Sequence, residues 1–167
     1  MSKAVMLSIR PNWCEKIASG EKTIEVRKTR PKLETPFKCY IYCTQSGVAL
    51  GAWGKHGKVI GEFTCDRIYG LAPLNHAPDD VEQQACLTRE EIVWYLKGVG
   101  YGWHISDLKI YDKPKELTEF HTWKKCKSCS KSGYESTACI YDKNCMVPVA
   151  ITKAPQSWYY VEEDDNG

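Results

Sequence analysis

Apolar and polar positions follow the two-residue period of β-strands along much of this chain. Residues 3–10 form a nearly continuous apolar run that ends before Pro11, and this run predicts a buried strand. Alternation or short apolar runs predict further strands over residues 22–28, 38–44, 58–69, 100–112 and 157–163. The chain is therefore expected to be built mainly from a sheet.

The segment 22–28 shows the alternation most clearly. Ile24 and Val26 are predicted to face inward, and the polar side chains Thr23, Glu25 and Arg27 are predicted to lie on the opposite, solvated face. This pattern is typical of a half-buried strand.

Two helices are predicted from their end signals. Pro11 at a first turn and Gly20 just past the end predict a short helix between them, with Trp13 and Ile17 on one buried face. Thr88 followed by Glu91 is a capping box, and it predicts a helix that ends at Gly98. Residues 114–123 are predicted to be a loop with one helical turn, and residues 124–147 follow neither period.

Length and composition limit the class of protein. The chain has 167 residues, 43% hydrophobic and 26% charged, which fits one globular domain over residues 1–167 and excludes a wholly disordered chain. No apolar run is long enough for a membrane span, and the start does not resemble a secretory signal, so we expect a cytoplasmic protein without a membrane partner. The element order predicts the α+β class, with a mixed or antiparallel sheet that closes into a small barrel.

Charge is unevenly distributed although the net charge is only +2. Residues 1–70 contain 12 Lys and Arg against 6 Asp and Glu, whereas residues 71–120 contain 5 against 9. A basic first half is compatible with a polyanionic partner, and equally with an ordinary solvated surface.

A cluster of charged residues surrounds the first predicted helix. Arg10 ends the first strand, and Lys22, Glu25 and Arg27 lie at the start and in the body of the second. Guanidinium forks and an ammonium suit a phosphate-bearing or planar polar ligand. The alternative is a same-face pair of Glu25 and Arg27 on a solvated sheet.

The pattern Gly-x-Lys-x-x-Glu-x-Arg over residues 20–27, after Ser-Ile-Arg-Pro at 8–11, resembles the ASCH domain of the PUA-like superfamily. Gly-Trp-His-Ile at 102–105 and Pro-Gln-Ser-Trp at 155–158 are similar to ASCH proteins of phages and prophages. The resemblance implies a small mixed β-barrel with a cleft suited to nucleic acid or modified nucleosides.

A nucleic-acid-binding domain, for RNA or single strands, is therefore the favoured hypothesis. Aromatic side chains beside cations are typical base-stacking platforms. The predicted ligand-binding residues are Arg10, Trp13, Lys22, Glu25, Arg27, Trp103, His104 and Trp158. A purely structural role is the alternative for His104.

Two other functions stay open. A bacterial relative in the family is similar to a hydrolase of N(4)-acetylcytidine that uses a Lys, a Thr and a Glu; Lys22 matches the Lys, but Glu25 stands where the Thr belongs. An amidohydrolase or a ribonuclease would use Lys22 and Glu25 as catalytic residues. The third possibility is a protein-interaction module without catalysis, in which the cysteine-rich segment forms the contact surface.

Four of the nine cysteines lie within 20 residues, at positions 126, 129, 139 and 145. Cys126, Cys129, Cys139 and Cys145 could hold a structural zinc ion tetrahedrally, with His121 as a possible substitute ligand. We therefore expect a zinc-binding insertion over residues 121–147; a flexible insertion with free thiols is the alternative. The other cysteines are predicted to be small core residues.

Overall fold

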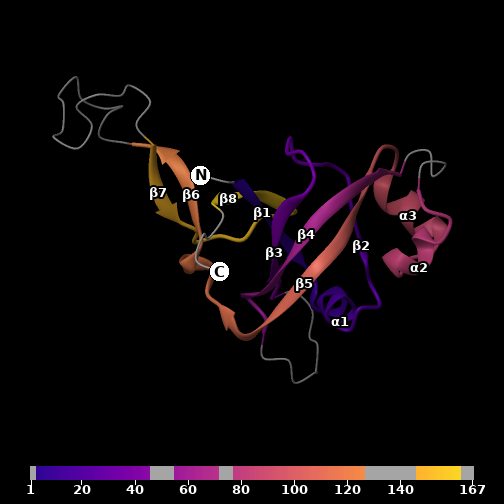
Figure 1. Cartoon of the computed structure of the whole chain (residues 1–167), viewed down its shortest axis with the longest axis horizontal. Helices are drawn as coiled ribbons and strands as arrows, with labels where there is room; N and C mark the ends of the chain where they lie inside the picture. Colours follow the sequence, from indigo (N-terminus) through magenta and orange to yellow (C-terminus); the bar gives the residue numbers. More distant parts are fainter. Residues whose placement is uncertain (1–2, 46–54, 72–76, 127–145, 163–167) are drawn as a thin grey trace.

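The computed structural model describes residues 3–45, 55–71, 77–126 and 146–162. Its main element is a six-stranded sheet with the strand order β2-β5-β4-β3-β1-β8, and β6 and β7 form a separate hairpin (Figure 1). The strands are β1 Lys3–Ile9, β2 Ile24–Arg27, β3 Phe37–Cys43, β4 Lys58–Gly70, β5 Tyr101–Lys115, β6 His121–Lys125, β7 Met146–Ala150 and β8 Trp158–Glu162. All six predicted strands are confirmed.

The sheet is mixed because β1 runs parallel to β3, whereas the other neighbouring strands are antiparallel. Register shifts interrupt the pairing of β4 with β3 and β5, and such bulges bend and twist strands. The result is a strongly curved half-barrel with few helices. Of the two predicted sheet types, mixed or antiparallel, the structure has the mixed one.

Both predicted helices are present. Helix α1 (Pro11–Ala18) begins at Pro11, and Gly20 follows it with a φ of +81°. Helix α3 (Arg89–Leu96) has Thr88 at its N-cap with the predicted capping box to Glu91. A short helix α2 (Val81–Ala85) precedes it and was not predicted, because five residues are too few to show a helical period.

The prediction that β2 is half-buried is wrong. All four residues of β2 are buried, and its apolar face, with Ile24 and Val26, packs against Val81, Ala85, Ile92 and Leu96 of α2 and α3. The face with Glu25 and Arg27 is also buried, because it lies on the side of the main core around Trp103. Helices α2 and α3 therefore turn an alternating strand into one that is covered on both faces.

The predictions for residues 114–123 and 124–147 are corrected where the structure has strands. Residues 117–119 form the expected helical turn, η2 (Leu117–Glu119), but β6 and β7 are paired strands on either side of the cysteine-rich segment. The hairpin projects away from the six-stranded sheet (Figure 1). Among the described residues, no helix has the length and apolarity that a membrane crossing requires.

Candidate functional site

Three charged side chains from one short stretch of chain lie together inside the protein. Lys22, Glu25 and Arg27 are 2%, 6% and 8% exposed. Oε2 of Glu25 lies 3.5 Å from Nζ of Lys22, and Oε1 lies 3.0 Å from Nη2 of Arg27. One carboxylate thus serves two cations, and we call these three residues the buried ionic cluster.

The turn between α1 and β2 positions Lys22. Its backbone N–H donates to the carbonyl oxygen of Lys16, and its ammonium donates to the carbonyl oxygen of Ala85 at 2.6 Å. Nζ also lies 5.0 Å from the ring centre of Trp13, on α1. Because β2 alternates, Glu25 and Arg27 share the face that points toward this ammonium.

Arg27 and Trp158 connect β2 and the residues just after it with β1 and β8. Nη2 of Arg27 donates to the carbonyl oxygen of Ser8 at 2.8 Å, and so joins β2 to β1. Nε1 of Trp158 on β8 donates to Oγ1 of Thr29, just after β2, at 2.9 Å. These two bonds bring β2 and β8 together at one end of the curved sheet.

Aromatic rings adjoin the ionic cluster. Trp103 is the cross-strand neighbour of Glu25 and is fully buried, and its ring lies 5.9 Å from that of Trp158. Trp13 and Trp158 are partly exposed. Two buried donors in this region, Nε of Arg27 and Nε1 of Trp103, have no hydrogen-bond partner. A buried N–H without an acceptor is costly, so an acceptor group that reached either donor would be bound favourably.

Two predicted ligand-binding residues lie outside the cluster. Arg10 is exposed at the N-cap of α1, whereas Lys22, Glu25 and Arg27 are buried. His104 is the cross-strand neighbour of Ile24, on the other face of the sheet from Trp103. Its Nδ1 lies 2.6 Å from Oδ1 of Asp66. Burial raises the pKa of Asp66, but the hydrogen bond and charge of His104 outweigh it and lower the pKa below its usual value.

The structure adds residues that sequence reasoning missed. Ser8 and Ala85 bind the cations through backbone carbonyl oxygens, and no sequence pattern reveals such contacts. Thr23 lies against α2, where its hydroxyl donates to the side chain of Gln84 at 3.2 Å. The neighbouring carboxylate, Glu82, accepts from the backbone N–H of Arg89. Neither Thr23 nor Glu82 thus joins the ionic cluster.

The cysteines separate into two groups. Cys14, Cys39, Cys43 and Cys65 are buried in the main core, as predicted, whereas Cys86 is only partly buried. Of the predicted zinc ligands, Cys126 is partly buried, and Cys129, Cys139 and Cys145 lie outside the described residues. Among residues 3–45, 55–71, 77–126 and 146–162, no group of three or more His, Cys, Asp or Glu could hold a metal ion. The zinc site stays a prediction.

Comparison with known proteins identifies the fold. No protein-family model and no curated protein matches the chain. Among solved structures, it is similar to the ASCH protein of Zymomonas mobilis, with 17% identity, a TM-score of 0.61 and coverage of 96% of this chain and 88% of that one. A tyrosine-to-phenylalanine variant of that protein gives the same identity and TM-score, with coverage of 97% and 92%. At this identity the likeness shows the fold alone. The predicted fold of an ASCH protein is confirmed. Membership of the PUA-like superfamily and a phage or prophage origin stay predictions.

Proposed function

We propose that this ASCH-fold domain binds nucleic acid, as RNA or a single strand, and takes one base at the buried ionic cluster. One observation carries the proposal: two unpartnered buried donors, on Arg27 and Trp103, lie beside a carboxylate and partly exposed tryptophan rings. A nucleobase offers both the acceptor oxygens that these donors lack and a flat face for stacking.

The cluster is suited to selection rather than to strong attraction. Glu25 already offsets part of the charge on Lys22 and Arg27, and burial makes any unpaired polar group in this region expensive. A ligand must therefore supply matching acceptors and donors. Such a site rejects a base with the wrong pattern, because its own buried groups would then remain unpaired.

Binding to a matched panel tests the proposal. Mononucleotides, 12-nucleotide RNA, single-stranded DNA and duplexes would be titrated at two salt concentrations, with tryptophan fluorescence as the readout. Single strands should bind more tightly than duplexes, with affinity that falls as salt rises. Equal affinity for duplexes and single strands, or no binding at all, would contradict the proposal.

Glu25→Gln tests the role of the carboxylate. It should weaken binding by about 1.5–3 kcal/mol through loss of a charge-assisted hydrogen bond. Glu21→Gln is the matched control, because Glu21 is exposed and pairs with Lys16 at the surface. Both variants must be shown to be folded at the temperature of the titration.

A hydrolase of modified nucleosides is the second candidate, favoured by the direct contact of Lys22 with Glu25. The ammonium of Lys22 donates to the carbonyl oxygen of Ala85, and the hydroxyl of Thr23 donates to Gln84. Thr23 therefore does not replace the family's Thr as a nucleophile. Release of acetate from N(4)-acetylcytidine, lost in Glu25→Gln with binding retained, would establish hydrolysis in place of pure binding.

A further inference from the structure

A row of aromatic rings runs from the core toward the surface along β8. The ring of Trp158 lies 5.9 Å from that of Trp103 and 5.5 Å from that of Tyr160. Nζ of Lys3 lies 5.8 Å from the ring centre of Tyr160 and ends the row with a cation. Trp158 and Tyr160 share one face of the strand because they are two residues apart, and both are partly exposed.

The segment that follows β2 is fixed beside this row by the polar tips of the same two aromatic side chains. Trp158 donates to Oγ1 of Thr29, and the hydroxyl of Tyr160 accepts from the backbone N–H of Lys32 at 2.7 Å. Lys28, Arg30 and Lys32 in this segment are exposed. Nζ of Lys28 lies 5.2 Å from the ring centre of Tyr95 on α3. The bond to Tyr160 holds the backbone of Lys32 beside β8, and Arg30 precedes Lys32 by two residues in a segment without strand or helix.

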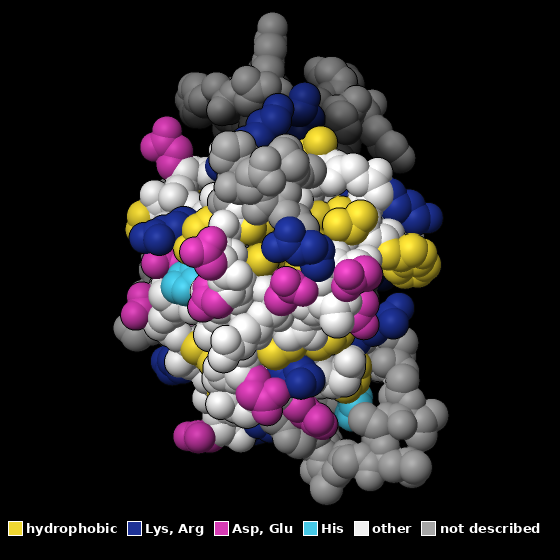
Figure 2. Space-filling model, turned by 90° about the vertical axis from the view of Figure 1, so that its right-hand side faces the viewer, with side chains coloured by type: hydrophobic (Ala, Val, Ile, Leu, Met, Phe, Trp, Pro, Cys, Tyr) yellow, Lys and Arg dark blue, Asp and Glu magenta, His cyan; other side chains and the backbone are white. Residues whose placement is uncertain are grey.

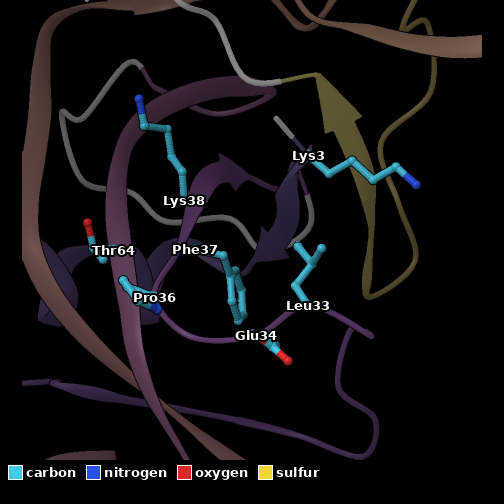
Figure 3. A pocket seen from close by; sticks show the side chains of 7 residues that line it. All are labelled: Lys3, Leu33, Glu34, Pro36, Phe37, Lys38 and Thr64. Carbon is cyan, nitrogen blue, oxygen red and sulfur yellow. The ribbon is translucent and has the colours of Figure 1, made fainter. Parts of the chain in front are cut away.

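A hollow lies where this segment ends. It has a volume of about 390 Å³ and is lined by Lys3, Leu33, Glu34, Pro36, Phe37, Lys38 and Thr64 (Figure 3). Lys3 and Lys38 extend to different sides of it, and Glu34 is its one carboxylate (Figure 3). The ring of Phe37 packs edge-on against that of Trp103, with 5.8 Å between the ring centres. Phe37 therefore connects the hollow, which it lines, with the aromatic row, which begins at Trp103.

The face with α2 and α3 has a different character. Val93, Trp94 and Val99 are exposed there, but Lys, Arg, Asp and Glu side chains are interspersed around the hydrophobic ones (Figure 2). A polyanion is not attracted strongly to such a mixed surface. The row on β8, by contrast, has Lys3 at one end and the exposed residues Arg30 and Lys32 on the segment bound to it. Proteins that bind single-stranded nucleic acids combine aromatic rings with cations in this way.

We propose that Trp158 and Tyr160, with Lys3, Arg30 and Lys32, form a track along which a single-stranded nucleic acid leaves the ionic cluster. The inference rests on the proposed function and adds the path of the strand. Bases stack on the two rings, and the phosphates lie along the three cations. The hollow at the end of the segment accepts a further nucleotide.

The test compares two triple variants with the same loss of charge. Lys3→Ser, Arg30→Ser and Lys32→Ser are combined in one protein. The control combines Lys109→Ser, Lys113→Ser and Lys153→Ser, at exposed positions on β5 and before β8. Mononucleotides and six-nucleotide RNA and DNA would be titrated against both and against the original protein.

The track variant should bind six-nucleotide strands at least about tenfold more weakly at 0.1 M salt, with a salt slope smaller by about 2. Its affinity for mononucleotides should be unchanged, and the control should match the original protein throughout. Equal effects of the two variants, or equal affinity of the original protein for one and six nucleotides, would overturn the track alone. If the original protein binds no nucleotide of any length, the proposed function fails with it.

Discussion

Glu25 and Arg27 form an ion pair of 3.0 Å in which both side chains are about nine-tenths buried. The two residues lie on one face of a four-residue strand, and Lys22 approaches the same carboxylate from the preceding turn. Taking such charges out of water is expensive, and their attraction offsets the cost only while every partner is present. The cluster is thus a point at which a single substitution has a large effect.

The first prediction concerns this dependence. Glu25→Gln leaves two buried cations without a counter-charge, so the free energy of unfolding should fall by about 3 kcal/mol or more. Glu21→Gln breaks the pair with Lys16, whose side chains are 61% and 41% exposed, and should cost less than about 1 kcal/mol. Urea unfolding of both variants measures the difference. Equal losses would show that the buried pair contributes no more than the exposed one.

For β2, the sequence predicts the strand itself but not the burial of its polar face. The alternation of Ile24 and Val26 with polar residues identified the strand correctly, because its period depends only on local geometry. It did not reveal that the polar face is buried, because that depends on Trp103 and Ser8, which are distant in sequence. The sequence motif identifies the charged residues of the cluster. It does not predict that Lys22 binds Ala85 or that Arg27 binds Ser8, because both contacts use backbone carbonyl oxygens, which every residue has.

The close approach of β2 and β5 gives the second prediction. A Cβ atom added to Gly102 would lie 2.9 Å from Cγ2 of Ile24, which is buried and cannot move away freely. Gly102→Ala should therefore lower the free energy of unfolding by about 1–3 kcal/mol. Gly70→Ala is the control, since its Cβ would meet nothing within 4 Å, and it should be neutral or slightly stabilising. A thermal melt of each variant decides; destabilisation by Gly70→Ala of the same size would refute the steric explanation.

Alkaline pH gives the third prediction. Burial, with a smaller effect of the neighbouring Tyr42, raises the pKa of Tyr159 to about 12. In the unfolded chain the hydroxyl of Tyr159 loses its proton near pH 10, whereas in the folded protein it keeps the proton until about pH 12. The contribution of Tyr159 to stability is therefore fully present below pH 10 and is lost as the pH rises toward 12. The free energy of unfolding should therefore fall between about pH 10 and 12. Tyr159→Phe should make the decline shallower; an unchanged pH dependence would show that Tyr159 does not contribute to it.

The buried thiols give the fourth prediction. Cys14, Cys39, Cys43 and Cys65 are at most 1% exposed, so a thiol reagent should modify them only when the chain unfolds. A side-chain hydrogen bond from Cys14, which outweighs burial, lowers the pKa of Cys43, but the absence of access should still prevent reaction. In native protein Cys86, which is partly buried, should react far faster than these four. Mass spectrometry after brief labelling identifies the modified positions, and rapid labelling of Cys43 would contradict the prediction.

The last prediction concerns zinc and follows from the sequence of the segment between β6 and β7. Protein purified without chelator should hold about one zinc ion per chain, bound by Cys126, Cys129, Cys139 and Cys145. The buried core thiols make a simple count of native thiols uninformative, so the decisive measurement is elemental analysis of paired variants. Cys126→Ser should lose the metal, whereas Cys86→Ser, outside this segment, should retain it. The six-stranded sheet should keep its unfolding temperature in Cys126→Ser, because its core contains none of the four predicted ligands. Zinc that is absent from the original protein, or that survives Cys126→Ser undiminished, would refute this ligand set.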